Sequence, residues 1–267
     1  MKKYSLVVRA DAGAAGDMFL GALYSLCVSI QEKDIAGIDV GKLKEKILAL
    51  GSSLGEGFKV QFANEMRLDQ ESLRIVLVSE SDLKKSHHVT PKKINSMLEK
   101  YMADGLLNEA EVLSARQIID IISVAESIAH GVTVDKVHFH EIGEEDSIFD
   151  IIASGILVST LREALGEFKV YYSPVEVGHG KVDTSHGLLD IPAPATRNII
   201  LDSGMKTKCE FSGECLPPTG AAVLASLKPS LISLLSPDDI DIITKGSGCG
   251  SSNPNDRSNI LTIELIN

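Results

Sequence analysis

Short runs of strand-forming residues alternate along this chain with longer segments in which apolar residues recur at helical spacing. The pattern predicts strands at residues 5–9, 58–64, 73–79, 136–140, 169–177, 240–244 and 259–265, and helices at residues 17–26, 42–50, 91–101, 108–130 and 147–165. The runs at 58–64 and 73–79 flank a polar segment, which is typical of a β-hairpin. We therefore expect a mixed α/β (α+β) fold, in which helices flank a mixed sheet within one compact domain over residues 1–267.

Several helix ends are marked by residues with a capping role. Thr90 followed by Pro91 predicts an N-cap and a proline at the first helical position. A longer helix is expected to begin at Asn108, with acidic residues in its first turn, and to stop at His130-Gly131. The last third of the chain is richer in Gly, Pro, His and Thr, and its polar stretches lead into short helices.

The composition excludes several classes of protein. A hydrophobic fraction of 44% with 24% charged residues is ordinary for a globular chain, and no apolar run approaches the roughly 18 residues of a membrane helix. We expect a cytoplasmic protein, because the N-terminus lacks a secretory pattern and the 4 cysteines contain no CxxC pair. The formal charge of −11 argues against nucleic acid as a partner, but not against a small phosphorylated ligand held by backbone amides. The number of subunits stays open, a homo-oligomer included.

The segment DKVHFHEIGEEDSIFD, at 135–150, concentrates groups that bind metals and transfer protons. Side chains alternate between the two faces of a strand. With Val137 and Phe139 on the buried face, both histidines would share the other face, about 7 Å apart at Cβ. Imidazole suits zinc, copper, iron and nickel, and a carboxylate can complete the ligand shell. We therefore predict His138 and His140 as metal ligands.

The acids that follow these histidines are candidate general bases: Glu141, Asp146 and Asp150. Asp150 comes four residues after Asp146 in an apolar helical run, so the two carboxylates lie on one helix face. A carboxylate in such a run is costly unless it points into a polar site. A structural role stays open, because acids before a helix complement its dipole and Asp146 could cap it.

The segment ADAGAAGDM, at 10–18, leads from a strand into a helix through small residues. Gly13, Gly16 and Asp17 would bring helix amides close to an anion such as a phosphate. The spacing is neither a Walker loop nor GxGxxG. The structural alternative is tight backbone packing, with Asp17 as an acid in the first helical turn.

Two segments of the last third are also candidate ligand-binding loops. His179 and His186 lie among glycines, where side chains can approach a ligand. PPTGAA, at 217–222, offers Thr219 and Gly220 before a helix as a second anion site. A simple N-cap by Thr219 is the structural alternative.

Five motifs follow one another along the chain: GAAGDMFLGAL, AESIAHG, VHFHEIGEEDSIFDI, VGHG…HGLLDIPAPAT and GE..PPTGAA. In sequence and order they resemble the LarC family of nickel insertion proteins, and the resemblance extends from about residue 5 to about residue 265. The resemblance implies an enzyme, a nickel-inserting cyclometallase. Its substrate would be pyridinium-3,5-bisthiocarboxylic acid mononucleotide, its product the nickel-pincer cofactor of lactate racemase, and CTP would be hydrolysed.

The residues named above fit this chemistry, and we assign them hypothetical roles. His138 and His140 would hold or deliver Ni²⁺, and Glu141, Asp146 or Asp150 would accept the ring proton that leaves when the nickel–carbon bond forms. The glycine loops would bind the phosphate of the mononucleotide.

The resemblance also implies a missing part. The family's C-terminal domain, associated with CTP and with Mg²⁺ or Mn²⁺, would lie beyond this chain, and some relatives encode it separately as a partner. Two alternatives stay open: a non-catalytic subunit that binds metal and substrate, and a metal-dependent hydrolase of a phosphorylated small molecule.

Overall fold

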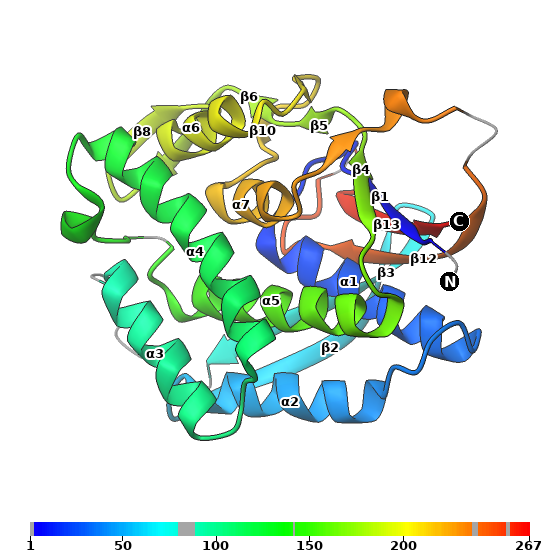
Figure 1. The fold of residues 1–267 in the computed structure, drawn as a ribbon. Coiled ribbons are helices and arrows are strands. Elements are labelled where there is room, and N and C mark those ends of the chain that lie inside the picture. Colours follow the sequence, from blue (N-terminus) through cyan, green and yellow to red (C-terminus); the bar gives the residue numbers. More distant parts are fainter. Residues whose placement is uncertain (1–2, 80–88, 141, 237–239, 255–256) are drawn as a thin grey trace.

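The core of the fold is a mixed sheet in the order β11-β4-β1-β13-β12-β3-β2 (Figure 1). The structure, a computed structural model, describes residues 3–79, 89–140, 142–236, 240–254 and 257–267. The strands of this sheet are β1 (Ser5–Arg9), β2 (Phe58–Arg67), β3 (Gln70–Ser79), β4 (Lys169–Tyr172), β11 (Ser230–Leu231), β12 (Ile242–Cys249) and β13 (Ile260–Ile266). Strand β1 runs parallel to β4 and antiparallel to β13, and β2 and β3 form the expected antiparallel hairpin. The predicted mixed α/β class is therefore confirmed.

The helices cover the sheet in successive layers (Figure 1). They are α1 (Gly16–Glu32), α2 (Val40–Ser53), α3 (Pro91–Ala103), α4 (Glu109–His130), α5 (Glu145–Leu165), α6 (Pro194–Ser203) and α7 (Pro218–Ser226). Helix α1 contacts β12, β3 and β13, and on its other side it contacts α5. Helix α4 lies one layer further out, against α5, α6 and α7. The apolar side chains between these layers form one cluster of buried residues.

Short strands between β4 and α7 lie outside the main sheet. They are β5 (Val175–Glu176), β6 (Gly178–His179), β7 (Lys181–Thr184), β8 (Gly187–Asp190), β9 (Thr207–Lys208) and β10 (Gly213–Glu214), which pair as β5-β9, β6-β10 and β7-β8. The fully buried carboxylate of Glu176 holds this region together, because it accepts hydrogen bonds from the amides of Gly178, Glu210 and Phe211. Hydrogen bonds of this kind satisfy a charge that would otherwise be costly to bury.

Helix α1 lies unusually close to the sheet, backbone against backbone. A Cβ atom added at Gly248 of β12 would lie 2.2 Å from the carbonyl oxygen of Met18, and one at Gly246 would lie 2.2 Å from the amide nitrogen of Leu26. From the helix side, a Cβ at Gly21 would lie 2.3 Å from the carbonyl oxygen of Leu73. Only glycine allows this approach, so these three positions set the distance between α1 and the strands.

The capping residues found in the sequence act as expected. The Thr90 side chain accepts a hydrogen bond from the Lys93 amide at the start of α3. Asn108 and Glu111 form a reciprocal capping box at the start of α4, which satisfies two backbone donors that the helix leaves unpaired. Gly131 ends this helix in the left-handed conformation, at φ 65°.

Two local predictions are wrong, and two of the structural alternatives do not hold. Residues 136–140 do not form a strand: a 3-10 helix, Val134–Lys136, is followed by a single β-bridge between Phe139 and Val89. The expected strand 169–177 is interrupted between β4 and β5, at Pro174, which has no amide to donate. Thr219 does not cap α7, because the N-cap is Pro217. Asp146 does not cap α5 either, since it lies in the first turn after the N-cap Glu144.

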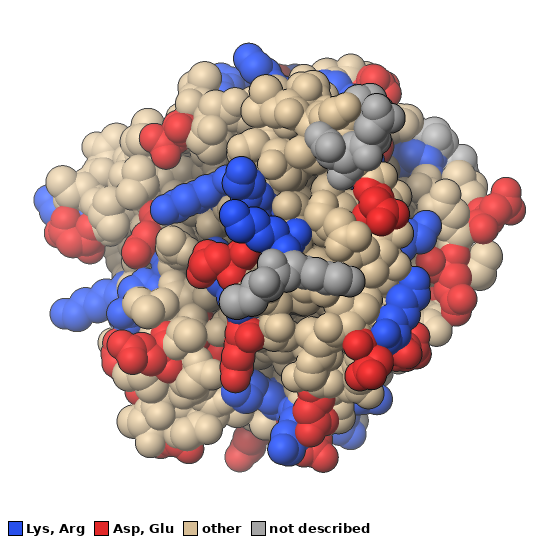
Figure 2. Space-filling view, turned by 45° about the vertical axis from the view of Figure 1, so that its right-hand side comes forward, with Lys and Arg blue, Asp and Glu red and all other residues tan. Residues whose placement is uncertain are grey.

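On the face shown in Figure 2, charged side chains of both signs are mixed. Figure 2, which brings the right-hand side of Figure 1 forward, shows Lys and Arg side chains interspersed with Asp and Glu side chains on this face. Among the described helices, none has the length and apolar character required to span a membrane.

The substitution Gly248→Ala tests the contact between α1 and the sheet. We expect it to lower the free energy of unfolding by about 2 kcal/mol or more, because the new methyl group collides with helix backbone that cannot rotate away. Gly37→Ala is the matched control, since nothing lies within 4 Å of a Cβ added there, and a change within about 0.5 kcal/mol is expected. Chemical denaturation measures both values, and equal stability of the two variants would contradict the close packing described here.

Candidate functional site

A cavity of about 270 Å³ opens where the C-terminal end of α4 meets the β7-β8 hairpin and the first turns of α6 and α7. Its polar lining comprises Glu126, His130, His140, Thr184, Ser185, His186 and Glu214. Its apolar wall includes Ile142, Leu189, Pro194 and Pro218. The cavity therefore combines ionisable groups on one side with a surface that excludes water on the other.

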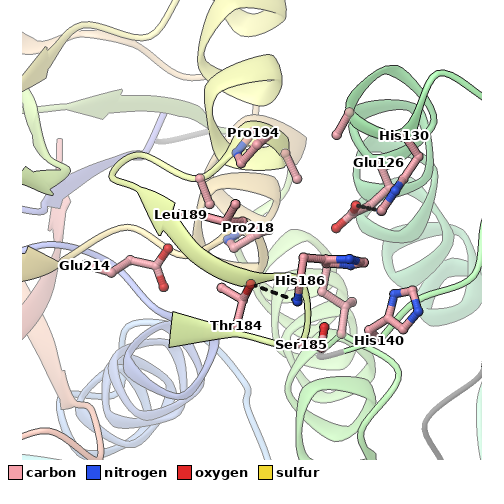
Figure 3. Close-up of a pocket in the computed structure, with 14 residues that line it drawn as sticks. Glu126, His130, His140, Thr184, Ser185, His186, Leu189, Pro194, Glu214 and Pro218 are labelled. Carbon is pink, nitrogen blue, oxygen red and sulfur yellow. Dashed lines mark hydrogen bonds and ion pairs between the residues drawn. The ribbon is translucent and has the colours of Figure 1, made fainter. Parts of the chain in front are cut away.

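Three histidines from three separate segments meet in this cavity (Figure 3). The ring centroids of His140 and His186 are 4.6 Å apart, those of His130 and His186 are 4.9 Å apart, and those of His130 and His140 are 6.2 Å apart. One possible ligand atom from each ring lies within 4.8 Å of the other two. We call these residues the histidine cluster.

Local structure fixes the position of each member of the cluster. His130 occupies the last turn of α4, and Gly131 turns the chain away immediately after it. His140 follows Phe139, whose ring is buried and whose amide donates to the Val89 carbonyl at 2.8 Å. His186 lies at the tip of the β7-β8 hairpin, and its amide donates to the Thr184 hydroxyl at 3.1 Å.

The histidine cluster is chemically suited to a divalent transition metal. Neutral imidazole is a ligand for nickel, zinc, copper and iron. Three protein ligands leave further coordination positions open, as in metal sites that bind a substrate. The Glu126 carboxylate lies 3.3 Å from Nε2 of His130, one helical turn earlier on α4.

Only one of the two predicted metal ligands belongs to the histidine cluster. Val137 and Phe139 are both buried, as the alternation required. His140 lines the cavity, whereas the exposed His138 is not among the cluster members found in the described residues. The assignment of these two histidines as metal ligands stays a prediction.

The two loop histidines are separated in the structure. His186, predicted to bind substrate, belongs to the histidine cluster. His179 is exposed on β6, its amide donates to the Phe211 carbonyl, and it does not line the cavity.

A second ionisable group lies between the N-terminal ends of α1 and α5. Asp150 contacts the start of α1 so closely that a Cβ at Gly16 would be 2.9 Å from its Oδ2 atom. Burial, and then the charges of Asp17 and Asp146, raise the pKa of Asp150 well above its usual value. Burial also raises the pKa of Asp17, although hydrogen bonds from the amides of Ser251 and Met18 act in the opposite direction. Asp146 is exposed; Glu141, the third predicted base, lies outside the described residues.

The two glycine segments pack against each other. The amide of Gly13 donates to the Ala10 carbonyl, and the next amide, of Ala14, donates to the Cys215 carbonyl. A Cβ at Gly220 of α7 would lie 1.8 Å from the carbonyl oxygen of Ala14. Tight backbone packing, the structural alternative for residues 10–18, is therefore present, and Asp17 lies in the first turn of α1.

Three ionisable residues of the cavity were not predicted as site residues from the sequence: Glu126, His130 and Glu214. His130 was considered only as a helix end. The four-residue spacing of Glu126 and His130 was the available signal, because residues so spaced share a helix face. No comparable pattern indicated Glu214, which reaches the cavity from β10.

The substitution Asp150→Asn tests the raised pKa. A carboxyl group whose pKa is higher in the folded than in the unfolded state contributes stability below about pH 4, and this contribution is lost as the pH rises through the folded-state value. We therefore expect the variant to become more stable than wild type as the pH increases from 4 to 8. The difference should reach about 1 kcal/mol or more, since one unit of pKa shift corresponds to about 1.4 kcal/mol.

Thermal unfolding measured across this pH range checks the expectation. The exposed Asp202→Asn is the matched control, with a difference from wild type that stays within about 0.5 kcal/mol. If the stability of Asp150→Asn changed with pH in the same way as that of wild type, the burial described for this carboxyl group would be contradicted.

Comparison with known proteins gives consistent matches. The family model described as nickel insertion protein matches residues 6–266. A pyridinium-3,5-bisthiocarboxylic acid mononucleotide nickel insertion protein of Alkaliphilus metalliredigens is 30% identical over 84% of this chain and 52% of its own length. One of the same name from Staphylococcus saprophyticus is 32% identical over 92% of this chain and 56% of its own length.

A putative nickel insertion protein of Myxococcus xanthus is 32% identical over 97% of this chain and 60% of its own length. The chain thus spans between half and two thirds of these curated relatives. No solved structure matches it significantly. Because the family model covers nearly the whole chain, this protein belongs to the nickel insertion protein family.

Proposed function

We propose that this chain binds Ni²⁺ at the histidine cluster and inserts it into pyridinium-3,5-bisthiocarboxylic acid mononucleotide. The observation that carries the proposal is the convergence of three imidazoles, from three segments, in one cavity with an apolar wall. Relatives with this substrate in their names support the choice of metal and substrate. Nickel is a substrate of this reaction and has to leave its binding site. Neutral nitrogen ligands bind the ion without the negative charge of thiolates or carboxylates.

The proposed reaction exchanges a proton for a metal. Ni²⁺ forms a bond to the ring carbon between the two thiocarboxylate groups, and the C–H bond at that carbon breaks. The proton needs an acceptor, and we take Asp150 first among the predicted bases, because a carboxylate with a raised pKa holds a proton more strongly near neutral pH. Asp146 and Glu141 are the other candidates.

The phosphate of the mononucleotide needs hydrogen-bond donors. The N-terminal ends of α1 and α7 lie side by side, since Gly220 contacts Ala14. The first amides of a helix have no partner within it and favour an anion. In this proposal the backbone amides of Gly16, Asp17, Thr219 and Gly220 are the candidate donors, and His179 belongs to the approach to them.

The complete reaction is proposed to require more than this chain. CTP, with Mg²⁺ or Mn²⁺, would be used by a C-terminal half of the kind that accounts for the remaining length of the relatives. The product would be the nickel-pincer cofactor of lactate racemase. The alternative is a subunit that binds metal and substrate while a partner carries the nucleotide chemistry. The share of the relatives' length that this chain covers supports this alternative equally.

Nickel binding by single variants tests the metal site. His130→Ala and His186→Ala should each weaken Ni²⁺ binding at least about tenfold, because each removes one of three ligands. His138→Ala should leave the affinity within about twofold of wild type if the histidine cluster is the site. Isothermal titration calorimetry measures all three affinities, and loss of binding in His138→Ala alone would favour the HxH pair and overturn the cluster.

Separate measurements of nickel binding and nickel insertion test whether Asp150 is the general base. Asp150→Asn should keep the nickel affinity of wild type, since it touches no member of the histidine cluster. Nickel insertion, assayed by the absorbance of the product with the C-terminal half supplied, should fall about 100-fold or more, the usual contribution of a general base. Asp202→Asn is the control again, and insertion at the wild-type rate by Asp150→Asn would exclude this residue as the proton acceptor.

A further inference from the structure

Glu126 lines the cavity beside the histidine cluster without belonging to it. Its side chain is 17% exposed, and its Oε2 atom lies 3.3 Å from Nε2 of His130, four residues later on α4 (Figure 3). The pair lies at the C-terminal end of the helix, where the next residue, Gly131, turns the chain away.

Such a contact determines which ring nitrogen can bind a metal. A neutral imidazole carries one N–H group and one nitrogen with a free lone pair. A carboxylate accepts only from the N–H group, so the contact with Glu126 favours the proton on Nε2 of His130 and leaves Nδ1 with the lone pair. Metal-binding histidines in proteins commonly donate their other N–H group to a carboxylate in this way.

Glu126 contacts His130, which lies at the exposed end of α4. The His130 side chain is 32% exposed and lies at a helix end, where the ring would otherwise sample several rotamers and both tautomers. His140 and His186 are positioned by different contacts, through the bridge at Phe139 and the hairpin turn at Thr184. The effect of Glu126 should therefore be exerted through a single ligand.

We infer that Glu126 is a positioning residue for nickel: it orients the His130 ring and selects the tautomer that presents Nδ1 to the ion. The inference rests on the proposed function, because it assumes that the histidine cluster binds Ni²⁺. It adds a residue outside the cluster whose loss weakens binding although all three imidazoles remain. Partners of this kind typically contribute a factor of about 10 to 100 in metal affinity.

Calorimetric titration of the whole chain with Ni²⁺ alone tests the inference. Glu126→Ala should bind nickel about 10- to 100-fold more weakly than wild type. The nickel affinity of Glu126→Gln should lie between those of wild type and Glu126→Ala, since the amide oxygen still accepts a hydrogen bond but carries no charge. Glu163→Ala removes an exposed carboxylate of α5 that does not line this cavity, and it should bind as wild type does.

A spectroscopic measurement separates positioning from general damage to the fold. In nitrogen-15 spectra of the metal-free protein, the His130 ring should carry its proton on Nε2 in wild type and show a mixture of tautomers in Glu126→Ala. The tautomers of His140 and His186 should stay the same in both proteins. A change in all three rings would indicate a collapsed cavity and would overturn the specific role of Glu126.

The outcomes distinguish this inference from the proposed function. If wild type does not bind Ni²⁺, or if His186→Ala binds it normally, the proposed metal site fails. If both behave as expected but Glu126→Ala keeps the wild-type affinity, only the role of Glu126 fails. A nickel-soaked crystal in which a Glu126 oxygen itself coordinates the ion would also overturn the positioning role, because the residue would then be a ligand.

Discussion

The close contact between α1 and the sheet determines where everything else lies. Glycines at 21, 246 and 248 let the helix backbone touch strand backbone, so the helix cannot slide or tilt without a collision. Packing in protein interiors leaves little room for adjustment. The N-terminal end of α1 is therefore fixed relative to β12 and β3, and it carries Gly16 and Asp17 to the position where Asp150 meets them.

The contact between α1 and the sheet also affects where the cavity lies. Helix α1 supports α5 and α7, and α4 packs on both of these helices. At the start of α7, Gly220 lies against the Ala14 carbonyl while Pro218 lines the cavity. The first turn of α7 thus contacts both the cavity and the loop at the start of α1, so a shift of α1 would change both regions together.

Local features of the sequence predicted local structure well. The capping box at Asn108, the stop at Gly131 and the burial of Val137 and Phe139 all depend on residues within a few positions of one another. The histidine cluster depends on contacts between distant segments. His140 meets His186 because the fold brings the tip of the β7-β8 hairpin to the loop before α5, and no spacing in the sequence encodes that approach.

The prediction that His138 pairs with His140 shows the limit of arguments from periodicity. Alternation correctly predicted that Val137 and Phe139 are buried, but it does not by itself show that the histidines between them bind one ion. The segment is a single bridge rather than a strand within a sheet, so its neighbours come from helices and a hairpin rather than from an adjacent strand. The histidines beside His140 come from distant parts of the chain, and one of them, His130, was predicted only as a helix end.

The separation of imidazoles from the buried carboxyl group has a chemical consequence for the proposed reaction. A carboxyl group whose pKa is raised keeps its proton longer as the pH rises, and a protonated carboxyl group is a poor metal ligand. In the proposed reaction Asp150 would therefore compete weakly for Ni²⁺ with the neutral nitrogens of the histidine cluster. Its ionised form, once present, has a strong tendency to regain a proton, which is the property required when a ring C–H bond is exchanged for a nickel–carbon bond. Burial of one carboxyl group beside two others would thus keep the metal and the departing proton on different residues.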